Sequence, residues 1–412
     1  MGNNDKRPKI RFKGFNDDWE QHKVSEITNF HKQGFYTTES YNDEKKYYLL
    51  RGTDLTENKL ILKDTPKINA TEKDYQAFKA QIGDFLIVRS GTVGTYGIVY
   101  EDIPAIFGSY LIDFRFNKNQ VINEFFGYFY QSDLFKNQLK MIIQQSANTN
   151  INAENIKSTF IKLPSLAEQK KISDYFQNID HLISLHQRKL EKLGNIKKSM
   201  LEKMFPKDEN KVPEIRFKGF NDDWEQRKLI EYLAVSKVKN KDEAYNKDDV
   251  LSVSGDYGIV NQIEFQGRSF AGASVTNYGV VATGDVVYTK SPLKSNPYGI
   301  IKTNKGKTGI VSTLYAVYKP LENTYPEFVQ IYFEQDARMN NYMHPLVNKG
   351  AKNDMKVSDE NALKGDVIFP QKEEQIKISE YFLRLDNLIS LHQRKLEKLK
   401  NIKKACLEKM FV

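Results

Sequence analysis

Only one cysteine, Cys406, occurs in the 412 residues of this sequence. A single cysteine excludes an internal disulfide and any zinc site built on several cysteines, and it fits a reducing compartment. Long apolar runs are scarce as well, because no stretch reaches the roughly 18 residues of a membrane span. Residues 1–13 are polar and basic and have no apolar signal region. We therefore expect a cytoplasmic protein that makes no contact with a membrane.

Catalytic motifs are also lacking. The six histidines never stand at the spacing of metal ligands, and neither a nucleophile-elbow serine nor a paired-carboxylate motif stands out. No glycine-rich cofactor loop follows a predicted strand at a suitable place. We predict that the chain is not an enzyme and that it carries no metal and no cofactor of its own.

The composition is that of a folded protein, with 40% hydrophobic, 28% charged and 12% aromatic residues. The length favours at least two domains, because one domain typically takes about 100–200 residues. A formal net charge of +9 favours a polyanionic partner such as nucleic acid. Many proteins without such a partner carry a similar excess, so the charge alone does not decide the function.

An internal repeat decides the organisation of the chain. Residues 10–21 return unchanged as residues 215–226, and 22 of the 26 residues in 180–205 return in 386–411. Between these matched segments lie 142 and 143 residues, 22–163 and 227–369, which share only scattered landmarks. Because the length is kept while the content differs, we predict one fold with two different surfaces.

The repeat divides the sequence into four segments. Residues 1–163 and 212–369 are each predicted to form a variable domain preceded by a conserved leading segment. Residues 164–211 and 370–412 are each predicted to form a conserved long helix.

The conserved segments carry a heptad pattern, with apolar residues at alternating steps of four and three after Pro164 and again after Pro370. Two such helices in one chain can pair, and they run antiparallel if a pseudo-two-fold axis relates the two halves. His186 and His392 fall on the seam, where a polar residue sets the register more often than it catalyses. The expected seam consists of Ile172, Phe176, Ile179, Ile183, His186, Leu190, Leu193, Ile378, Phe382, Leu385, Ile389, His392, Leu396 and Leu399.

The variable segments combine short β-branched and aromatic runs, such as 85–88 and 286–289, with one amphipathic helical stretch each, 122–143 and 326–343. We therefore predict an α+β fold, in which two α/β domains are separated by two long antiparallel coiled-coil helices.

Two loops in each variable segment carry residue types that contact DNA, namely amide, hydroxyl and basic side chains near glycine. For any single residue a solvated loop is an equally good interpretation, but the four matched loops together favour DNA contact. The candidates are Arg89, Ser90, Thr92, Thr95, Tyr96, Gln144, Gln145, Asn148 and Asn150 in the first half, and Lys290, Ser291, Lys294, Ser295, Asn296, Asn348, Lys349, Lys352 and Asn353 in the second.

In this order the motifs resemble the specificity subunit of a type I restriction-modification system. They are Phe-x-Gly-Phe-x-x-x-Trp at 12–19 and 217–224, a Gly-Asp pair before a strand, and Glu-Gln-x-Lys-Ile after Pro164 and Pro370. The resemblance covers nearly the whole chain, and every motif occurs twice.

The resemblance implies that each variable segment is a target recognition domain that reads one half of a split DNA sequence. The helices would then set the spacer between the two halves. It further implies double-stranded DNA, two modification subunits and two ATP-driven restriction subunits as partners. S-adenosylmethionine, ATP and Mg are expected on those partner subunits.

Two other interpretations stay open. A coiled-coil scaffold without DNA specificity explains the helices, but it does not explain two unlike domains of equal length. A self-contained adenine methyltransferase needs an Asn-Pro-Pro-aromatic signature to hold a flipped base. The sequence Asn296-Pro297-Tyr298-Gly299 matches that signature only in part, because the second proline is missing.

Overall fold

The computed structural model describes residues 6–42, 44–56, 58–89, 95–144, 151–207, 210–290, 296–349 and 355–412. The chain forms two compact units. The first comprises Met1–Gln187 and Arg394–Val412, and the second comprises Arg188–Gln393. Each unit therefore contains part of both conserved helical segments. The four sequence segments distinguished above stay a prediction about the modules of the chain.

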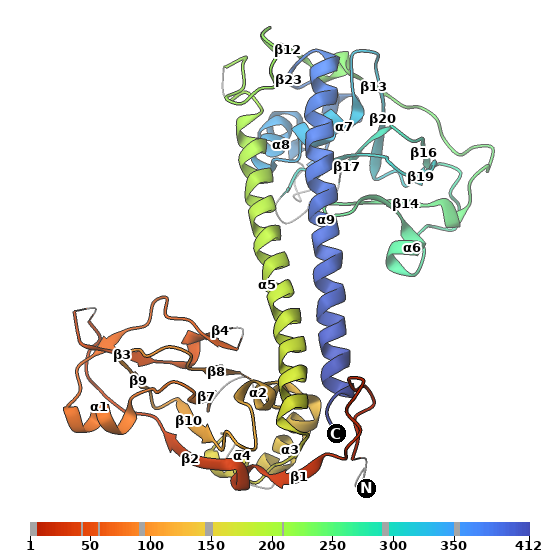
Figure 1. The fold of residues 1–412 in the computed structure, drawn as a ribbon. Coiled ribbons are helices and arrows are strands. Elements are labelled where there is room, and N and C mark those ends of the chain that lie inside the picture. Colours follow the sequence, from red (N-terminus) through yellow and green to blue (C-terminus); the bar gives the residue numbers. More distant parts are fainter. Residues whose placement is uncertain are drawn as a thin grey trace. The chain divides into compact units, whose positions relative to one another are not determined.

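The first unit is a layered α/β structure (Figure 1). Its strands are β1 Glu20–Lys23, β2 Thr28–Gln33, β3 Tyr47–Leu50, β4 Leu55–Thr56, β5 Lys59–Leu60, β6 Lys67–Ile68, β7 Phe85–Val88, β8 Tyr96–Ile98, β9 Ala105–Phe107, β10 Leu111–Phe116 and β11 Phe160–Leu163. Its shorter helices are α1 Glu72–Phe78, α2 Asn123–Gln131, α3 Asp133–Gln144 and α4 Ala153–Lys157.

The main sheet of this unit has the strand order β2-β10-β7-β8, and a second sheet has the order β6-β3-β9. Strand β7 is apolar throughout because side chains alternate between the two faces of a sheet and both faces are buried here. Phe85 and Ile87 pack with α2, and Leu86 packs with Phe107 of the second sheet.

The second unit repeats this plan. Its strands are β12 Glu225–Lys228, β13 Leu233–Val235, β14 Leu251–Ser254, β15 Gly258–Asn261, β16 Gly279–Val281, β17 Val286–Thr289, β18 Ile301–Thr303, β19 Gly309–Val311, β20 Tyr315–Pro320, β21 Asn348–Lys349, β22 Met355–Lys356 and β23 Asp366–Phe369, and its shorter helices are α6 Gln262–Gln266, α7 Pro326–Tyr332 and α8 Asp336–Met343. The main sheet has the order β13-β20-β17-β18, in which β17 and β20 take the places of β7 and β10. The prediction of one fold in both halves is confirmed.

The prediction of one helical stretch in each variable segment was wrong in one respect, because each stretch consists of two helices. In the first half α2 ends before Ser132, whose backbone is extended at φ −66 and ψ 151. The Ser132 hydroxyl accepts a hydrogen bond from the N–H of Phe135 and so caps α3. In the second half the break falls before α8, where Gln335 is extended. Residues 309–320, a run that a single strand could also explain, likewise form two strands, β19 and β20.

The two long helices are α5 Leu166–Lys203 and α9 Lys372–Lys409. In the first unit, the Tyr175 hydroxyl lies 3.5 Å from Cys406 Sγ, and Asp180 pairs with Lys403 at 2.6 Å. Because the partner number on α9 falls as the number on α5 rises, the helices run antiparallel, as predicted. All fourteen predicted seam residues are buried or half-buried. None of the described helices is apolar over enough length to span a membrane.

A lysine on each seam has a clear structural role. Lys403 Nζ donates to Gln131 Oε1 at 3.0 Å in addition to its ion pair with Asp180. In the second unit, Lys197 Nζ contacts Asp386 at 2.7 Å and Glu334 at 2.8 Å in the same way. Each lysine therefore ties one long helix to the other long helix and to the domain. Heptad spacing alone does not reveal these partners.

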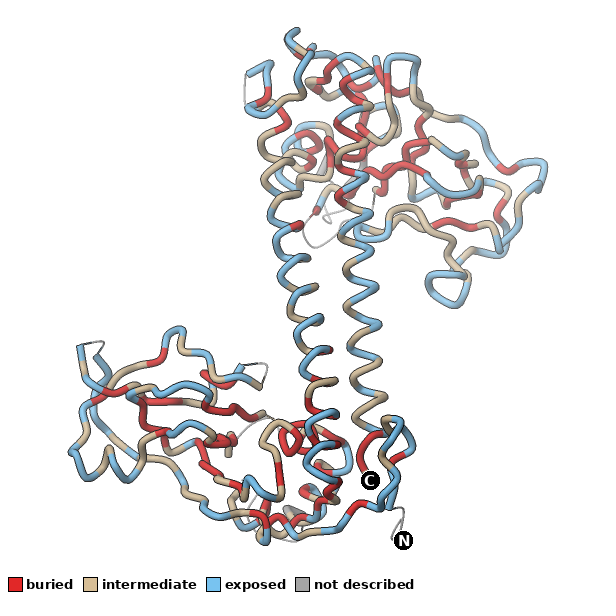
Figure 2. Tube along the Cα trace, viewed as in Figure 1, coloured by how far each residue is buried: buried red, intermediate tan, exposed pale blue. Residues whose placement is uncertain are grey.

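The end of a long helix completes the core of each unit. Met410 and Phe411, which follow α9, pack in the first unit with Trp19, Phe125 and Phe176. Phe205, which follows α5, packs in the second unit with Trp224, Phe328 and Phe382. Figure 2 shows the buried residues gathered in the sheets, in their covering helices and at the ends of the long helices.

The repeated leading segments are held by a buried ion pair. Arg11 donates from Nε and Nη2 to both oxygens of Glu168, at 2.7 and 2.8 Å. Arg216 binds Glu374 in the same two-pronged way, with both contacts at 2.8 Å. Both glutamates are almost fully buried, and a two-pronged arginine–carboxylate contact is among the strongest side-chain pairs. The conserved sequences thus form a frame, and the variable segments are mounted on it.

Candidate nucleic-acid interface

In the first half, the start of the first predicted loop contacts the end of the second. The backbone N–H of Arg89, which opens the first loop, donates to the carbonyl of Tyr110 at 2.9 Å. The N–H of Ile151, which follows the second loop, donates to the carbonyl of Arg89 at 3.2 Å. Ser90, Thr92, Gln145, Asn148 and Asn150 lie outside the described residues, as does the side chain of Gln144. The start of the first loop and the end of the second therefore lie together at one edge of the main sheet, where β7 ends.

A groove with exposed tyrosines adjoins this edge. It has a volume of about 650 Å³, and Thr95 and Val88 line it next to the first loop. Tyr36, Tyr41 and Tyr110 also line it, and 57–74% of their surface is exposed. Exposed aromatic rings are suited to stacking on bases or to contacting the methyl group of thymine. The sequence analysis missed these tyrosines, although the polar and aromatic run 36–41 was a usable signal.

Tyr96 was wrongly placed among the DNA contacts. Its side chain is 4% exposed, its ring stacks on Phe85 at 4.7 Å, and its hydroxyl accepts a hydrogen bond from Gln131. Burial raises its pKa above the ordinary value, so the hydroxyl stays neutral. Tyr96 is a core residue because it begins β8, where its side chain points towards α2. The prediction treated this position as part of a loop and therefore did not consider that side chains of a strand alternate between its two faces.

In the second half, the residue that opens the first predicted loop contacts a residue just beyond the second. Lys290 opens the first loop, and its Nζ pairs with Asp359, just beyond the second loop, at 2.6 Å. Its N–H donates to the carbonyl of Leu314, which is 62% exposed and stands where Tyr110 stands in the first half. Ser291, Lys294, Ser295, Lys352 and Asn353 lie outside the described residues, as do the side chains of Asn348 and Lys349 in β21.

Asn296 takes part in the packing of this region. It is 7% exposed, and its Nδ2 donates to Asp336 at the start of α8 at 2.7 Å. It therefore holds the end of the first loop against the helix that leads to the second loop. In this position Asn296 does not present its amide to solvent, so the expected base contact is not supported.

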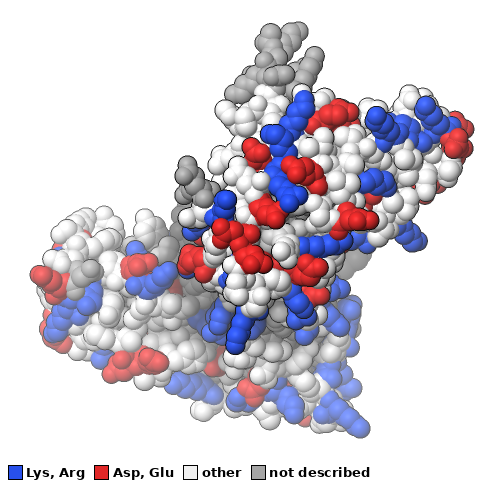
Figure 3. All heavy atoms as spheres, turned by 90° about the horizontal axis from the view of Figure 1, so that it is seen from above, with Lys and Arg blue, Asp and Glu red and all other residues white. Residues whose placement is uncertain are grey.

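Charge does not outline the interface by itself. On the face drawn in Figure 3, Lys and Arg side chains lie among Asp and Glu side chains and form no continuous basic patch. Among the described residues no group of three or more His, Cys, Asp and Glu is placed to hold a metal ion. The contacts between the loop ends and the exposed tyrosines therefore indicate the position of the interface better than the net charge does.

The sequence analysis also missed two buried carboxylates in the first unit, those of Asp84 and Asp113. Arg115 Nε donates to Asp84 at 2.7 Å, and Arg115 Nη2 lies 3.2 Å from Asp113 without hydrogen-bond geometry. Burial and the neighbouring Asp84 raise the pKa of Asp113 to about 8. The second unit keeps only the first of these carboxylates, as Asp285, which forms an ion pair with Lys319. It has Val317 at the position of Asp113.

The substitution Asp113→Val, which introduces the residue of the second half, is expected to flatten the pH dependence of the first unit. Because burial raises the folded-state pKa, the stability that Asp113 contributes by staying neutral is fully present below about pH 4 and is lost as the pH rises through about 8. Each unit of pKa difference corresponds to about 1.4 kcal/mol. Amide hydrogen exchange in β10 at pH 5 and pH 8 measures the change.

The second unit serves as the internal control for this experiment. Strand β20, which carries Val317, should show the same exchange in the wild type and the variant at both pH values. If β10 of the wild type were equally stable at pH 5 and pH 8, the assignment of a protonated Asp113 would be wrong.

Similarities to known proteins agree with this architecture. Residues 16–195 match the family model "Type I restriction modification DNA specificity domain". The chain is 25% identical over 419 residues to the specificity subunit of a type I restriction enzyme, MjaX, from Methanocaldococcus jannaschii, covering 95% of this chain and 92% of the relative. A segment of 196 residues is 23% identical to the EcoBI specificity subunit of Escherichia coli, covering 46% of this chain and 41% of that protein.

The fold agrees with a solved structure as well. The type I restriction-modification S subunit from M. genitalium superposes with a TM-score of 0.59 over 98% of this chain and 99% of that chain, at 15% identity. The chain is therefore similar, over nearly its whole length, to specificity subunits of type I restriction-modification systems.

Proposed function

We propose that this chain is the DNA sequence-recognition subunit of a type I restriction-modification complex and that its two units read the two halves of a split target. The observation that carries the proposal is that residues at the ends of the two predicted loops contact each other in each unit, Arg89 with Ile151 in the first and Lys290 with Asp359 in the second. The frame is nearly identical in the two halves, whereas the loops differ in sequence. Two domains that recognise different DNA sequences need different side chains at equivalent positions.

The long helices are proposed to fix the unspecific spacer between the two half-sequences. Their paired seams and the lysine ties at Lys197 and Lys403 support a rigid element, because each lysine is held by two partners. A fixed spacer requires such rigidity, since DNA advances about 34 Å per turn of roughly 10 base pairs.

The chain is proposed to act without a catalytic site of its own, in a complex with DNA and with partner subunits. We propose two modification subunits and two restriction subunits, one for each of the two equivalent frames. S-adenosylmethionine, ATP and Mg would then be bound by these partners. The repeated leading segments and long-helix ends support two equivalent docking positions, because they build the same frame twice.

Mapping of methylated adenines tests this function. Cells that express the modification subunit with this chain are expected to methylate one two-part sequence, and cells without the chain are not. Replacing Tyr110 by Ala is expected to weaken binding to that sequence by about tenfold or more, since an aromatic–base contact contributes about 1–3 kcal/mol.

Tyr100→Ala is the matched control, because Tyr100 is also exposed but lies outside the groove and donates to Glu124. It should leave the binding unchanged. The same methylated sequence in cells with and without the chain would refute the proposed function. Equal effects of the two tyrosine variants would refute the role of the groove.

A further inference from the structure

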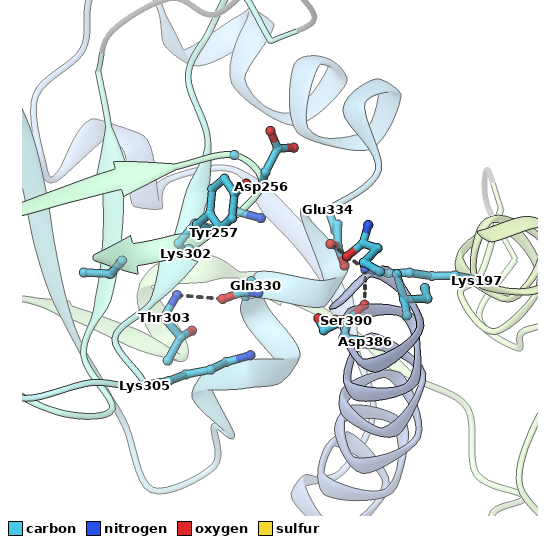
Figure 4. A pocket seen from close by; sticks show the side chains of 15 residues that line it. Lys197, Asp256, Tyr257, Lys302, Thr303, Lys305, Gln330, Glu334, Asp386 and Ser390 are labelled. Carbon is cyan, nitrogen blue, oxygen red and sulfur yellow. Dashed lines mark hydrogen bonds and ion pairs between the residues drawn. The ribbon is translucent and has the colours of Figure 1, made fainter. Parts of the chain in front are cut away.

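The second unit contains a cavity lined by residues of β15, β18, α7 and the two long helices. Its volume is about 590 Å³, within the range of about 300–1,000 Å³ that is usual for small-molecule sites. Figure 4 shows Lys302, Tyr257, Glu334 and Asp386 around this hollow, with Lys197 extending towards the two carboxylates.

Lys302 is the first unusual residue of this cavity. It lies on β18 and is only 7% exposed, yet within the described part of the chain it has no ion pair and no side-chain hydrogen bond. Burial without a partner lowers the pKa of this lysine. The amine has no partner in the described part of the chain and is not shut off from solvent, so it is available to a ligand in the cavity.

Glu334 supplies an unpaired acceptor in the same cavity. Its Oε1 accepts from Lys197 at 2.8 Å, but its Oε2 is buried without a hydrogen-bond partner. Lys197 already faces two carboxylates, Glu334 and Asp386, so this cluster has one negative charge in excess. The cavity is thus lined by a donor on Lys302 and by Glu334, whose carboxylate has one oxygen without a partner.

The first unit shows that the shared frame does not require this arrangement. Strand pairing places Gly97 at the position of Lys302, and Leu55 fills the space beside it. Gln131 stands at the position of Glu334 and still holds its lysine, Lys403, at 3.0 Å. The buried lysine and the glutamate are therefore additions peculiar to the second half.

We propose that this cavity is a nucleotide-binding site for a base that carries an amino group beside an acceptor atom. Adenine, guanine and cytosine have such an edge, and thymine does not. The amino group donates to Glu334 Oε2, and the acceptor atom takes the hydrogen bond of Lys302. The ring of Tyr257, which is 69% exposed at the cavity, stacks on the base, and Lys305 contacts the phosphate.

Titration calorimetry of the full chain with AMP, GMP, CMP and TMP tests the site. At least one of the first three is expected to bind, and TMP is expected to bind at least tenfold more weakly. Glu334→Gln and Lys302→Met are each expected to weaken binding tenfold or more, because a hydrogen bond to a charged group contributes about 1.5–3 kcal/mol. Glu334→Gln should keep the lysine tie, since Gln131 keeps it in the first unit, and unfolding temperatures check this.

A short single-stranded oligonucleotide in the same experiment separates a free nucleotide from a nucleotide of a DNA strand. Binding of the oligonucleotide alone, lost in both variants, assigns the site to a strand. The proposal is overturned if none of the probes binds, if TMP binds as well as the others, or if neither variant changes the affinity. A failure here leaves the proposed reading of the split target intact, because Lys290 and Asn296, the described ends of the first recognition loop, are not among the residues that line this cavity.

Discussion

Replacing residues 22–163 by the equivalent segment of another specificity subunit is expected to change one half of the methylated sequence completely and to leave the other half and the spacer unchanged. The two ends of this segment leave the frame side by side, because β1 pairs with β11 from Glu20 opposite Leu163 to Lys23 opposite Phe160. The corresponding ends in the second unit are joined by β12 and β23 in the same register. A foreign segment can therefore close on the same two strands.

The matched control is the exchange of residues 227–369 by the same donor method, which should change only the other half of the sequence. The donor segments should keep aromatic residues at Phe125 or Phe328, since these pack on Trp19 and Trp224 of the frame. Sequencing of methylated adenines gives both half-sequences at once. A single exchange that altered both halves would show that the units do not read independently.

The second large effect is expected at the end of α9. Phe411→Ala should lower the free energy of unfolding of the first unit by about 3–5 kcal/mol, the usual result of removing a buried phenylalanine side chain. Phe411 is 6% exposed, and its ring lies 5.4–6.5 Å from those of Trp19, Phe125, Phe129 and Phe176. The last residues of the sequence thus stabilise the domain formed by the first residues.

Hydrogen exchange resolved by residue measures this effect in β7 and β17 separately. Phe205→Ala is the counterpart in the second unit, because Phe205 packs on Trp224 and Phe328 in the same way. Phe411→Ala should speed exchange in β7 more than in β17, and Phe205→Ala should do the reverse. If both variants affected both strands equally, the helix ends would not belong to separate cores.

The sequence predicted the conserved frame better than it predicted the details of the variable domains. The repeat of 10–21 and of 180–205 predicted two equal units, and the heptads predicted the antiparallel helices. The break at Ser132 was not predicted, because α2 and α3 together carry one continuous amphipathic pattern. The Ser132 hydroxyl accepts a hydrogen bond from a backbone N–H and so ends the helix, which the pattern does not show. Tyr96 was misassigned since its aromatic ring suits a core and a DNA contact equally well.

The sequence by itself determined the doubled plan, because identical segments must fold alike in equivalent surroundings, and it determined the apolar seam, because a period of 3.5 residues places those side chains on one face of a helix. Tertiary structure alone decided which partners meet. The link between Arg89 and Ile151, the two carboxylates around Lys197 and the unpaired amine of Lys302 depend on segments far apart in the chain. Such contacts leave no periodic trace in the sequence, since they arise from the packing of elements against one another and not from the order of neighbouring residues.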